Sequence, residues 1–271
     1  MNMEFGICTD SLVPVRSEPS HTSEMVTQVL FGELYRIIEK TNLWVKIQLA
    51  FDNYEGWIHI KQTCFIDEHE FNRLAGSETP MTLDLVQIIS NETKNTMIPV
   101  LLGSSLPGYM SQRIQVNGEV FLYEGSVADP SEQAGTAGSL RTLQTRQNII
   151  ENAMLYLHAP YLWGGRSPFG IDCSGFVQMI YKLENIKLLR DARQQATQGE
   201  VISLLAEADP GDLVFFDDEE GNINHVGLVS ERRRVIHCSG KVRIDALDHE
   251  GIYNNELQKY THKLRLIKRV I

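Results

Sequence analysis

The residues most suited to chemistry lie between Gly170 and Tyr181, where Cys173 ends a glycine-containing loop and begins an apolar repeat. The repeat has helical spacing, so we expect a helix with Cys173 in its first turn and one face buried. The apolar side chains of that face are Phe176, Val177, Ile180 and Tyr181. Unpaired N–H groups at a helix start favour negative charge, so the thiol should lose its proton more easily than a free one and act as a nucleophile. A free cysteine is more often a small buried hydrophobic residue, and this segment alone leaves both interpretations open.

Two histidines follow in a region that predicts three antiparallel strands between residues 212 and 239. Alternation places His225 on one face of its strand and His237 on one face of the next. A hairpin through residues 231–234 would set the two rings side by side. A lone histidine in a strand is usually structural. Two of them on adjacent strands, after a helix-start cysteine, supply a base and a group that orients the base.

These motifs, together with an aromatic-glycine loop before them, resemble those of the NlpC-type cell-wall cysteine peptidases. In chain order the matching segments are Pro160-Tyr161-Leu162-Trp163-Gly164-Gly165, Asp172-Cys173-Ser174-Gly175-Phe176, Pro210-Gly211-Asp212-Leu213-Val214-Phe215-Phe216, His225-Val226-Gly227 and Ile236-His237. Five motifs in the family's order make the match specific. The resemblance implies a reduced papain-like fold, a Cys-His-His triad and activity on peptides of bacterial murein.

The resemblance also implies a role for each of these side chains. Cys173 attacks a carbonyl carbon to form an acyl-enzyme, His225 takes and returns the proton, and His237 holds that imidazole in the required tautomer. The tetrahedral oxyanion needs hydrogen-bond donors, for which the family pattern offers the Cys173 backbone N–H and the Tyr161 hydroxyl. This chemistry requires no metal and no cofactor.

The bond implied by the resemblance joins γ-D-glutamate to diaminopimelate or lysine in murein-derived peptides. We expect Asp172 to shape the loop before the nucleophile and Ser174 to donate to the free α-carboxylate of the glutamate. In the resembling peptidases an N-terminal barrel closes one end of the cleft, so that only a short peptide with a free amino terminus fits. A buried ammonium needs anionic partners. The candidates are Glu18 and Asp191, with Tyr54 closing over the substrate alanine.

The first 66 residues predict a small β-barrel, because short strands alternate with turns at regular spacing. Four segments resemble the bacterial Src-homology-3-type domains that accompany wall peptidases: Val15-Arg16-Ser17-Glu18-Pro19, Phe31-Gly32-Glu33, Trp44-Val45-Lys46-Ile47 and Tyr54-Glu55-Gly56-Trp57-Ile58. We expect Trp44 and Trp57 to pack within the barrel. Tyr54, which lies beside a turn, is the aromatic residue best placed to contact a ligand.

The whole chain is therefore predicted to be an α+β protein. Two small β-barrels, at residues 1–66 and 75–125, are followed by a linker at 126–140 and a papain-like peptidase domain at 141–271. In that domain the helix that carries the cysteine packs on an antiparallel β-meander. A preceding helix should stop before Pro160. Its predicted buried face consists of Leu143, Ile150, Ala153, Met154 and Leu157.

Composition narrows the partners and the location. The chain has 271 residues and a formal net charge of −10, which argues against nucleic acid or an anionic membrane surface as a partner. We expect a monomer. We also expect no insertion into membranes, because no span approaches about 18 consecutive apolar residues. Four scattered cysteines favour a reducing compartment. The first eight residues lack the features of a secretion signal, so we expect a cytoplasmic protein, or a periplasmic one if a signal has been removed.

Other functions compete with this prediction. An amidase or acyltransferase could use the same triad, and an endopeptidase could act on intact peptidoglycan. A binding protein with a decayed papain-like domain is disfavoured because all three triad positions are filled. A zinc site built from Cys173, Cys238 and the two histidines is disfavoured because His237 and Cys238 are adjacent in a strand and point to opposite faces.

Overall fold

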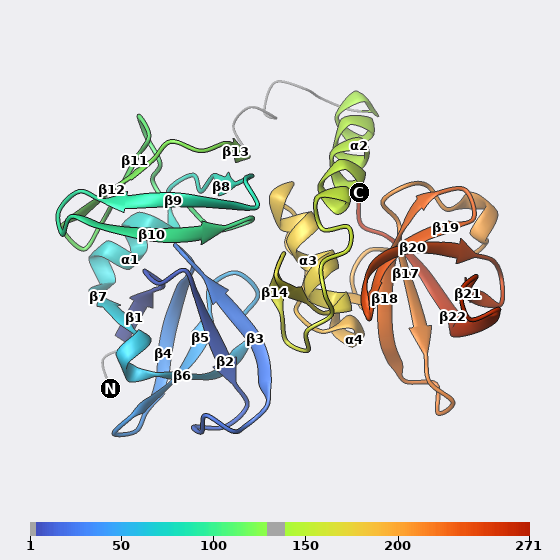
Figure 1. The fold of residues 1–271 in the computed structure, drawn as a ribbon, viewed down its shortest axis with the longest axis horizontal. Coiled ribbons are helices and arrows are strands. Elements are labelled where there is room, and N and C mark those ends of the chain that lie inside the picture. The colour runs from blue at the N-terminus through green and yellow to red at the C-terminus, as the bar shows by residue number, and fades with distance from the viewer. Residues whose placement is uncertain (1–3, 129–138) are drawn as a thin grey trace. The chain divides into compact units, whose positions relative to one another are not determined.

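The protein, seen here as a computed structural model, consists of two compact units, Met1–Ala134 and Gly135–Ile271 (Figure 1). The structure describes residues 4–128 and 139–271, so the predicted linker at 126–140 lies largely outside the described residues. The two units combine many short strands with a few helices, which confirms the α+β class. Among the described residues, no helix has the length and apolar character needed to cross a membrane.

The N-terminal unit begins with a seven-stranded antiparallel sheet in the order β3-β2-β6-β5-β4-β1-β7. Its strands are β1 (Glu4–Ile7), β2 (Leu12–Arg16), β3 (Met25–Leu30), β4 (Leu34–Lys40), β5 (Trp44–Leu49), β6 (Glu55–His59) and β7 (Cys64–Ile66), with the 3-10 turn η1 (Ile60–Gln62) before β7. Alternate side chains of these strands, such as Val13 and Val15, point into the core. Trp44 and Trp57 are buried, as expected.

The rest of this unit is built around helix α1 (Glu68–Ala75), which begins after Asp67. The Asp67 carboxylate caps the helix by accepting a hydrogen bond from the Glu70 backbone N–H at 2.7 Å. A four-stranded sheet follows in the order β10-β9-β12-β11, beside a two-stranded pair of β8 and β13. These strands are β8 (Met81–Thr82), β9 (Val86–Asn91), β10 (Thr96–Leu101), β11 (Arg113–Val116), β12 (Glu119–Tyr123) and β13 (Val127–Ala128).

One hydrophobic core joins the two β-regions of the N-terminal unit. It includes Phe5 and Phe31 from the first region, Phe71 from α1, and Ile89 and Phe121 from the second. The rings of Phe31 and Phe121 meet edge to face with centroids 5.6 Å apart. The first region also has a core of its own, which includes Val29 and Val45. Because the second region packs its apolar residues against the first, the two form a single compact unit although the sequence suggested separate domains.

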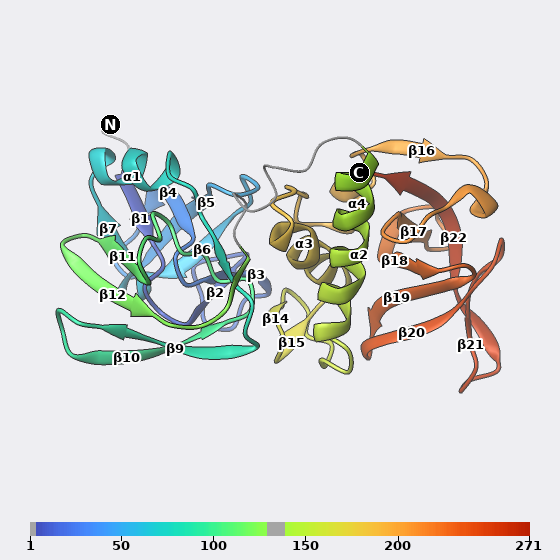
Figure 2. The ribbon, with the colours of Figure 1, turned by 90° about the horizontal axis from the view of Figure 1, so that it is seen from above.

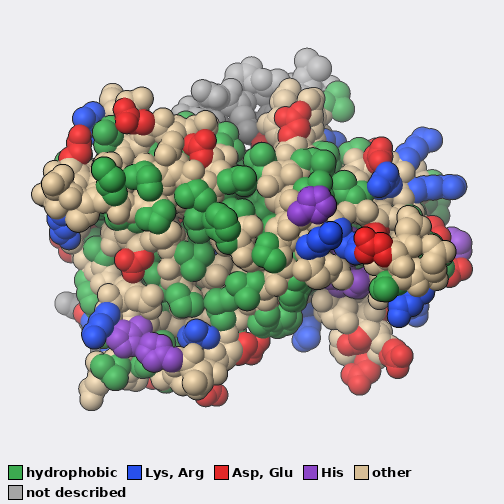
Figure 3. All heavy atoms as spheres, in the orientation of Figure 1, with side chains coloured by type: hydrophobic (Ala, Val, Ile, Leu, Met, Phe, Trp, Pro, Cys, Tyr) green, Lys and Arg blue, Asp and Glu red, His purple; other side chains and the backbone are tan. Residues whose placement is uncertain are grey.

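The second sheet of this unit is half-exposed. Ile89 and Val100 point into the core, while the opposite side of β9 and β10 carries exposed apolar side chains, visible in green over these strands in Figure 3. The large exposed side chains there are Leu85, Val86, Ile88 and Met97.

The C-terminal unit is a curved antiparallel sheet in the order β16-β22-β17-β18-β19-β20-β21, in which β21 also pairs with β22 and so closes a ring of six strands (Figure 1). The strands are β14 (Arg166–Ser167), β15 (Gly170–Ile171), β16 (Glu200–Ile202), β17 (Leu213–Asp217), β18 (Ile223–Glu231), β19 (Arg234–Ser239), β20 (Lys241–Leu247), β21 (Gly251–Asn254) and β22 (Lys259–Arg269). The helices are α2 (Ser139–Leu155), α3 (Cys173–Leu183), α4 (Ala192–Gln195) and the 3-10 turn η3 (Leu205–Glu207).

Helices α2 and α3 lie side by side against this sheet (Figure 2). Helix α2 ends before Pro160, as predicted, but its buried residues are Ile149 and Ala153, followed by Tyr156 just beyond its end. Leu143 and Met154, both predicted to be buried, are exposed. The buried face is rotated because the large ring of Tyr156 packs edge to face on Phe176 of α3, with centroids 6.0 Å apart.

Candidate active site

Cys173 is the first residue of α3, as predicted, and the preceding Asp172 is its N-cap. The Asp172 carboxylate accepts hydrogen bonds from the backbone N–H groups of Gly175 at 2.6 Å and Gly164 at 2.9 Å. It therefore ties the aromatic-glycine loop to the first turn of the helix. A Cβ at Gly175 would lie 2.3 Å from the Gly165 carbonyl oxygen, so only glycine allows this approach.

A buried arginine completes the support of this helix start. Arg190 binds both oxygens of Asp172, at 2.6 and 3.0 Å, and also donates to the Ser174 hydroxyl at 3.0 Å. The Ser174 hydroxyl in turn donates to Asp172 at 3.2 Å. The hydroxyl hydrogen of Ser174 is thus used within this network, and its donation to the substrate carboxylate stays a prediction. Asp172 shapes the loop, as predicted.

The two predicted histidines meet on adjacent strands. The hairpin of β18 and β19 pairs Glu231 with Arg234, so His225 and His237 come together with His225 Nε2 2.8 Å from His237 Nδ1. Gly227 lies directly opposite His237 in this register. A Cβ on Gly227 would be 2.9 Å from the His237 Cβ, so glycine leaves room for the imidazole.

A carboxylate that the sequence reasoning missed extends this pair into a chain. His237 Nε2 lies 2.9 Å from Asp245 Oδ2 on β20, and both side chains are buried. An ionised carboxylate only accepts hydrogen bonds, so His237 Nε2 carries the proton and Nδ1 accepts from His225 Nε2–H. The remaining lone pair of His225 is then on Nδ1. Asp245 thus sets the tautomer that a general base needs.

Arg243 holds Asp245 in place through two hydrogen bonds, at 2.6 and 3.0 Å. Burial raises the pKa of Asp245, but the hydrogen bonds from His237 and Arg243 outweigh it and lower that pKa below its usual value. The carboxylate is therefore ionised at neutral pH. A sequence signal existed: Asp245 interrupts the apolar positions of β20, whose buried residues include Val242 and Leu247.

The Cys173 thiol is not the acidic group that its position suggested. Burial, and then the negative charge of Asp172, raise the pKa of Cys173 to about 12, while the backbone N–H groups of Val226 and Ser174 act in the opposite direction. Desolvation of the thiolate thus outweighs the helix-start effect. Helix α3, which begins at Cys173, packs against β18, the strand that carries His225.

His225 is correspondingly neutral. Burial, and then the neighbouring His237 and His262, lower the pKa of His225 well below its usual 6.5. His262, on β22, stacks on His225 with ring centroids 4.1 Å apart. His262 was not identified from the sequence, because the last strand expected there runs only from Leu264 to Ile271, whereas β22 begins at Lys259. Among the described residues, His225, His237 and His262 form a cluster that could hold a metal ion, with ligand atoms within 4.8 Å of one another.

Tyr161 lies beside this centre. It forms a bridge to Ile171, two residues before Cys173, and its backbone N–H donates to Gly240 at 3.0 Å. Burial, and then the charges that Cys173 and Asp172 can carry, raise the pKa of the Tyr161 hydroxyl above its usual value. The hydroxyl is protonated at neutral pH and so can donate to an oxyanion.

The residues predicted to hold the substrate ammonium fall in both units. Asp191 caps α4 through a capping box with Gln194, whose side chain accepts from the Asp191 backbone N–H at 3.0 Å. Glu18 is exposed in the N-terminal unit, and Tyr54 there packs partly against the barrel core. Their contact with a substrate, and that of Asp191, remain predictions.

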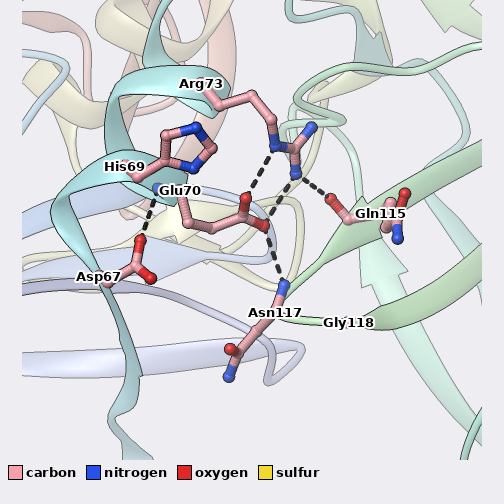
Figure 4. A pocket seen from close by; sticks show the side chains of 7 residues that line it. All are labelled: Asp67, His69, Glu70, Arg73, Gln115, Asn117 and Gly118. Carbon is pink, nitrogen blue, oxygen red and sulfur yellow. Dashed lines mark hydrogen bonds and ion pairs between the residues drawn. The ribbon is translucent and has the colours of Figure 1, made fainter.

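A surface pocket in the N-terminal unit is not part of this chemistry (Figure 4). It is lined by Asp67, His69, Glu70, Arg73, Gln115, Asn117 and Gly118. Arg73 donates to Glu70 at 2.7 Å and to the Gln115 carbonyl at 2.7 Å, and Glu70 accepts from the Asn117 backbone at 3.0 Å. These bonds join α1 to the β11–β12 turn, so the polar groups act in folding.

Known proteins resemble both units of this chain. The NlpC/P60 family model matches residues 158–263, and the bacterial dipeptidyl-peptidase SH3 domain model matches residues 15–62. A γ-D-glutamyl-L-lysine dipeptidyl-peptidase of Bacillus subtilis (strain 168) is 30% identical over 93% of this chain and 82% of that protein. Dipeptidyl-peptidase 6 of Lysinibacillus sphaericus is 26% identical over 89% of this chain and 91% of that protein. The crystal structure of an NlpC/P60 family protein from Bacillus cereus ATCC 10987 has the same fold, with a TM-score of 0.78 at 19% identity, over 98% of this chain and 99% of that one.

Proposed function

We propose, since this chain belongs to the NlpC/P60 family of cysteine peptidases, that it hydrolyses the bond between γ-D-glutamate and a diamino acid in short murein peptides. The diamino acid is diaminopimelate or lysine, and hydrolysis releases L-Ala-γ-D-Glu. The observation that carries the proposal is the buried chain of His225, His237 and Asp245, two of whose strands, β18 and β19, pack against the helix that begins at Cys173. It occurs in a protein whose relatives along nearly the whole chain are named dipeptidyl-peptidases.

The first half-reaction starts from a neutral thiol and a neutral imidazole. The Cys173 sulfur attacks the γ-carbonyl carbon as its proton moves to His225 Nδ1, so no free thiolate has to form in the buried site. The imidazolium is stabilised through His237 by the ionised Asp245. The Cys173 backbone N–H and the Tyr161 hydroxyl donate to the oxyanion.

The second half-reaction releases the products. His225 gives its proton to the departing amine of the diamino acid as the C–N bond breaks, which leaves a thioester on Cys173. Water then attacks the thioester while His225 takes a proton from it. Collapse of the second tetrahedral intermediate frees the glutamate carboxyl group and returns the proton to the thiol.

The enzyme should also require a free amino terminus on its substrate. An ammonium withdrawn from water needs an anionic partner, because leaving it unpaired costs several kcal/mol. Asp191, Glu18 and Tyr54 are the side chains we assign to this end of the substrate. The match of the dipeptidyl-peptidase SH3 domain to residues 15–62, which include Glu18 and Tyr54, supports the assignment.

The test is a comparison of matched peptides followed by mass spectrometry. L-Ala-γ-D-Glu-diaminopimelate and its lysine analogue should yield L-Ala-γ-D-Glu, and the N-acetylated forms should react about 100-fold more slowly or worse, because acetylation removes the charge and adds bulk. Asp191→Asn should narrow the difference in rate between the free and the N-acetylated peptides. His249→Ala, at an exposed position, is the matched control and should leave it unchanged.

Two other outcomes would redirect the proposal. Equal turnover of free and acetylated peptides, with release of fragments from intact sacculi, would identify an endopeptidase of the wall itself. No turnover of either peptide, with hydrolysis or transfer of other amides or esters, would favour the amidase or acyltransferase alternative.

We propose a cytoplasmic role in recycling wall peptides, carried out by a monomer. All four cysteines are free, which suits a reducing compartment, and Cys173 and the His225–His237–Asp245 chain all come from one polypeptide. Cell fractionation and size-exclusion chromatography with light scattering test the two points. Recovery in the periplasm, or a stable dimer, would contradict them.

A further inference from the structure

We propose that His225, His237 and His262 form a zinc site whose occupation reversibly inhibits the peptidase. Bound zinc would regulate the catalytic centre, and this inhibition rests on the peptidase activity proposed above. Zinc binding can be measured on inactive protein, so failure of this inference and failure of the proposed function are separable.

The spacing of the three rings suits a small tetrahedral ion. Zinc binds histidine nitrogens at about 2.0–2.1 Å, so two ligands of a tetrahedral site lie about 3.3 Å apart. His225 Nε2 and His237 Nδ1 are 2.8 Å apart, so they need to separate by only about half an ångström. The ligand atom of His262 lies within 4.8 Å of both.

A hydrogen bond to Asp245 orients His237 as a ligand. A metal-bound histidine almost always donates its second ring N–H to a carboxylate or another acceptor. His237 meets this condition through Asp245 at 2.9 Å, which leaves Nδ1 for the ion. His262 Nδ1 lies 2.9 Å from the Thr261 hydroxyl, a hydrogen bond that breaks when the ring turns toward the ion. Asp245 also supplies negative charge next to the ion.

His262 is the ligand through which zinc reaches the buried pair, and it is the side chain that has to move. His225 and His237 are only 6% and 1% exposed, whereas His262 is partly open to solvent. Its ring now stacks on His225 with an interplanar angle of 28°, so their in-plane lone pairs do not yet converge. Rotation of the His262 side chain brings its nitrogen to the ion, and water occupies the fourth position.

Inhibition follows from the tautomer. In the free enzyme His225 carries its proton on Nε2 and offers the Nδ1 lone pair to the thiol of Cys173. When zinc takes Nε2, that proton moves to Nδ1 and the imidazole stays neutral. No lone pair then remains to accept the thiol proton, so the ion blocks the base without touching the nucleophile.

Cys238 is outside this site, which distinguishes the cluster from a mixed cysteine–histidine centre. Its thiol donates to the Ile171 carbonyl at 3.1 Å, on the opposite face of β19 from His237. The donor set is therefore three neutral imidazoles, a set typical of zinc sites that keep one open position.

The test uses untagged full-length protein titrated with zinc chloride in a calorimeter. We expect one zinc per chain in the wild type and equally tight binding in Cys173→Ala. His262→Phe keeps an aromatic ring on His225 but removes a ligand. Loss of a group that hydrogen-bonds to a metal ligand costs about 10- to 100-fold in metal affinity. Loss of a ligand itself should cost at least as much, so His262→Phe should bind zinc about 100-fold more weakly or worse. His249→Ala, at an exposed histidine, should bind like the wild type.

Two further readouts accompany the titration. Cobalt should give a four-coordinate visible spectrum without a sulfur charge-transfer band, in both the wild type and Cys173→Ala. The zinc concentration that half-inhibits peptide hydrolysis by the wild type should equal the Kd for zinc. For His262→Phe, with its rate normalised to its own metal-free rate, half inhibition should need about 100-fold more zinc. Loss of binding in Cys173→Ala, unchanged binding in His262→Phe, or a sulfur–cobalt band would overturn the inference.

Discussion

The two halves of the active site are each held by a buried aspartate clamped by an arginine, but the two pairs do different work. Asp172, paired with Arg190, accepts backbone N–H groups at the start of α3. Asp245, paired with Arg243, accepts from the imidazole of His237. The same kind of ion pair thus fixes the backbone at the start of α3 in one case and the position of a proton on His237 in the other.

The difference separates folding from catalysis. Asp172 raises the pKa of the Cys173 thiol, so its charge works against the nucleophile that its hydrogen bonds position. Asp245 favours the imidazolium formed during reaction. We therefore expect loss of Asp172 to appear mainly in stability and loss of Asp245 mainly in the rate.

The largest effect is expected for Asp245→Asn. The asparagine amide can donate to His237 Nε2, which moves the proton of His237 to Nδ1 and forces His225 Nε2 to accept. His225 then presents N–H, not a lone pair, to Cys173, and kcat should fall by about two to four orders of magnitude. Steady-state kinetics on the tripeptide measure this.

Asp245→Ala is the matched variant, because alanine cannot donate and leaves the tautomer of His237 free. It should retain more activity than Asp245→Asn. If the two variants were equally active, Asp245 would be acting through structure alone.

The next effect concerns stability at the other pair. Asp172→Ala removes the helix cap and leaves the Arg190 guanidinium buried without its carboxylate, which costs about 3–5 kcal/mol of unfolding free energy. Urea denaturation followed by circular dichroism measures the shift in midpoint. Glu92→Ala, which breaks the exposed ion pair of Glu92 with Arg113, is the control and should leave the midpoint nearly unchanged. An equally small shift for Asp172→Ala would contradict the contrast between the pairs.

The smallest effect is the dependence of rate on pH. Protonation of His225 removes the base, so kcat/KM falls as the pH drops through its lowered pKa, below 6.5. Because the pKa of Cys173 is raised to about 12, thiolate formation adds no second limb near neutrality, and kcat at saturating tripeptide should stay flat from about pH 7 to 9.

Alkylation reports the same thiol directly. The rate at which iodoacetamide modifies Cys173 should rise about tenfold per pH unit between pH 7 and 9, because only the thiolate reacts. A rate that is already at its maximum at pH 7 would show an acidic cysteine and restore the expectation drawn from the helix start.

The sequence predicted the site as far as local patterns reach. The helix start at Cys173 and the hairpin that joins His225 to His237 followed from periodicity and turn position. Asp245 and His262 were missed because β20 was not predicted and β22 was placed too short, so neither residue had an assigned face. The pKa of Cys173 could not be predicted, since burial depends on packing by distant segments.

The central claim, that Cys173 becomes acylated by the γ-glutamyl group, is tested by trapping the intermediate. The enzyme is mixed with L-Ala-γ-D-Glu-diaminopimelate, quenched in acid within the first turnover, and digested for mass spectrometry. We predict an L-Ala-γ-D-Glu acyl group on the peptide that contains Cys173, absent in Cys173→Ala and not replaced by label on Cys8, Cys64 or Cys238. Product formation at the wild-type rate in Cys173→Ala, or an acyl group on any other residue, would contradict the account.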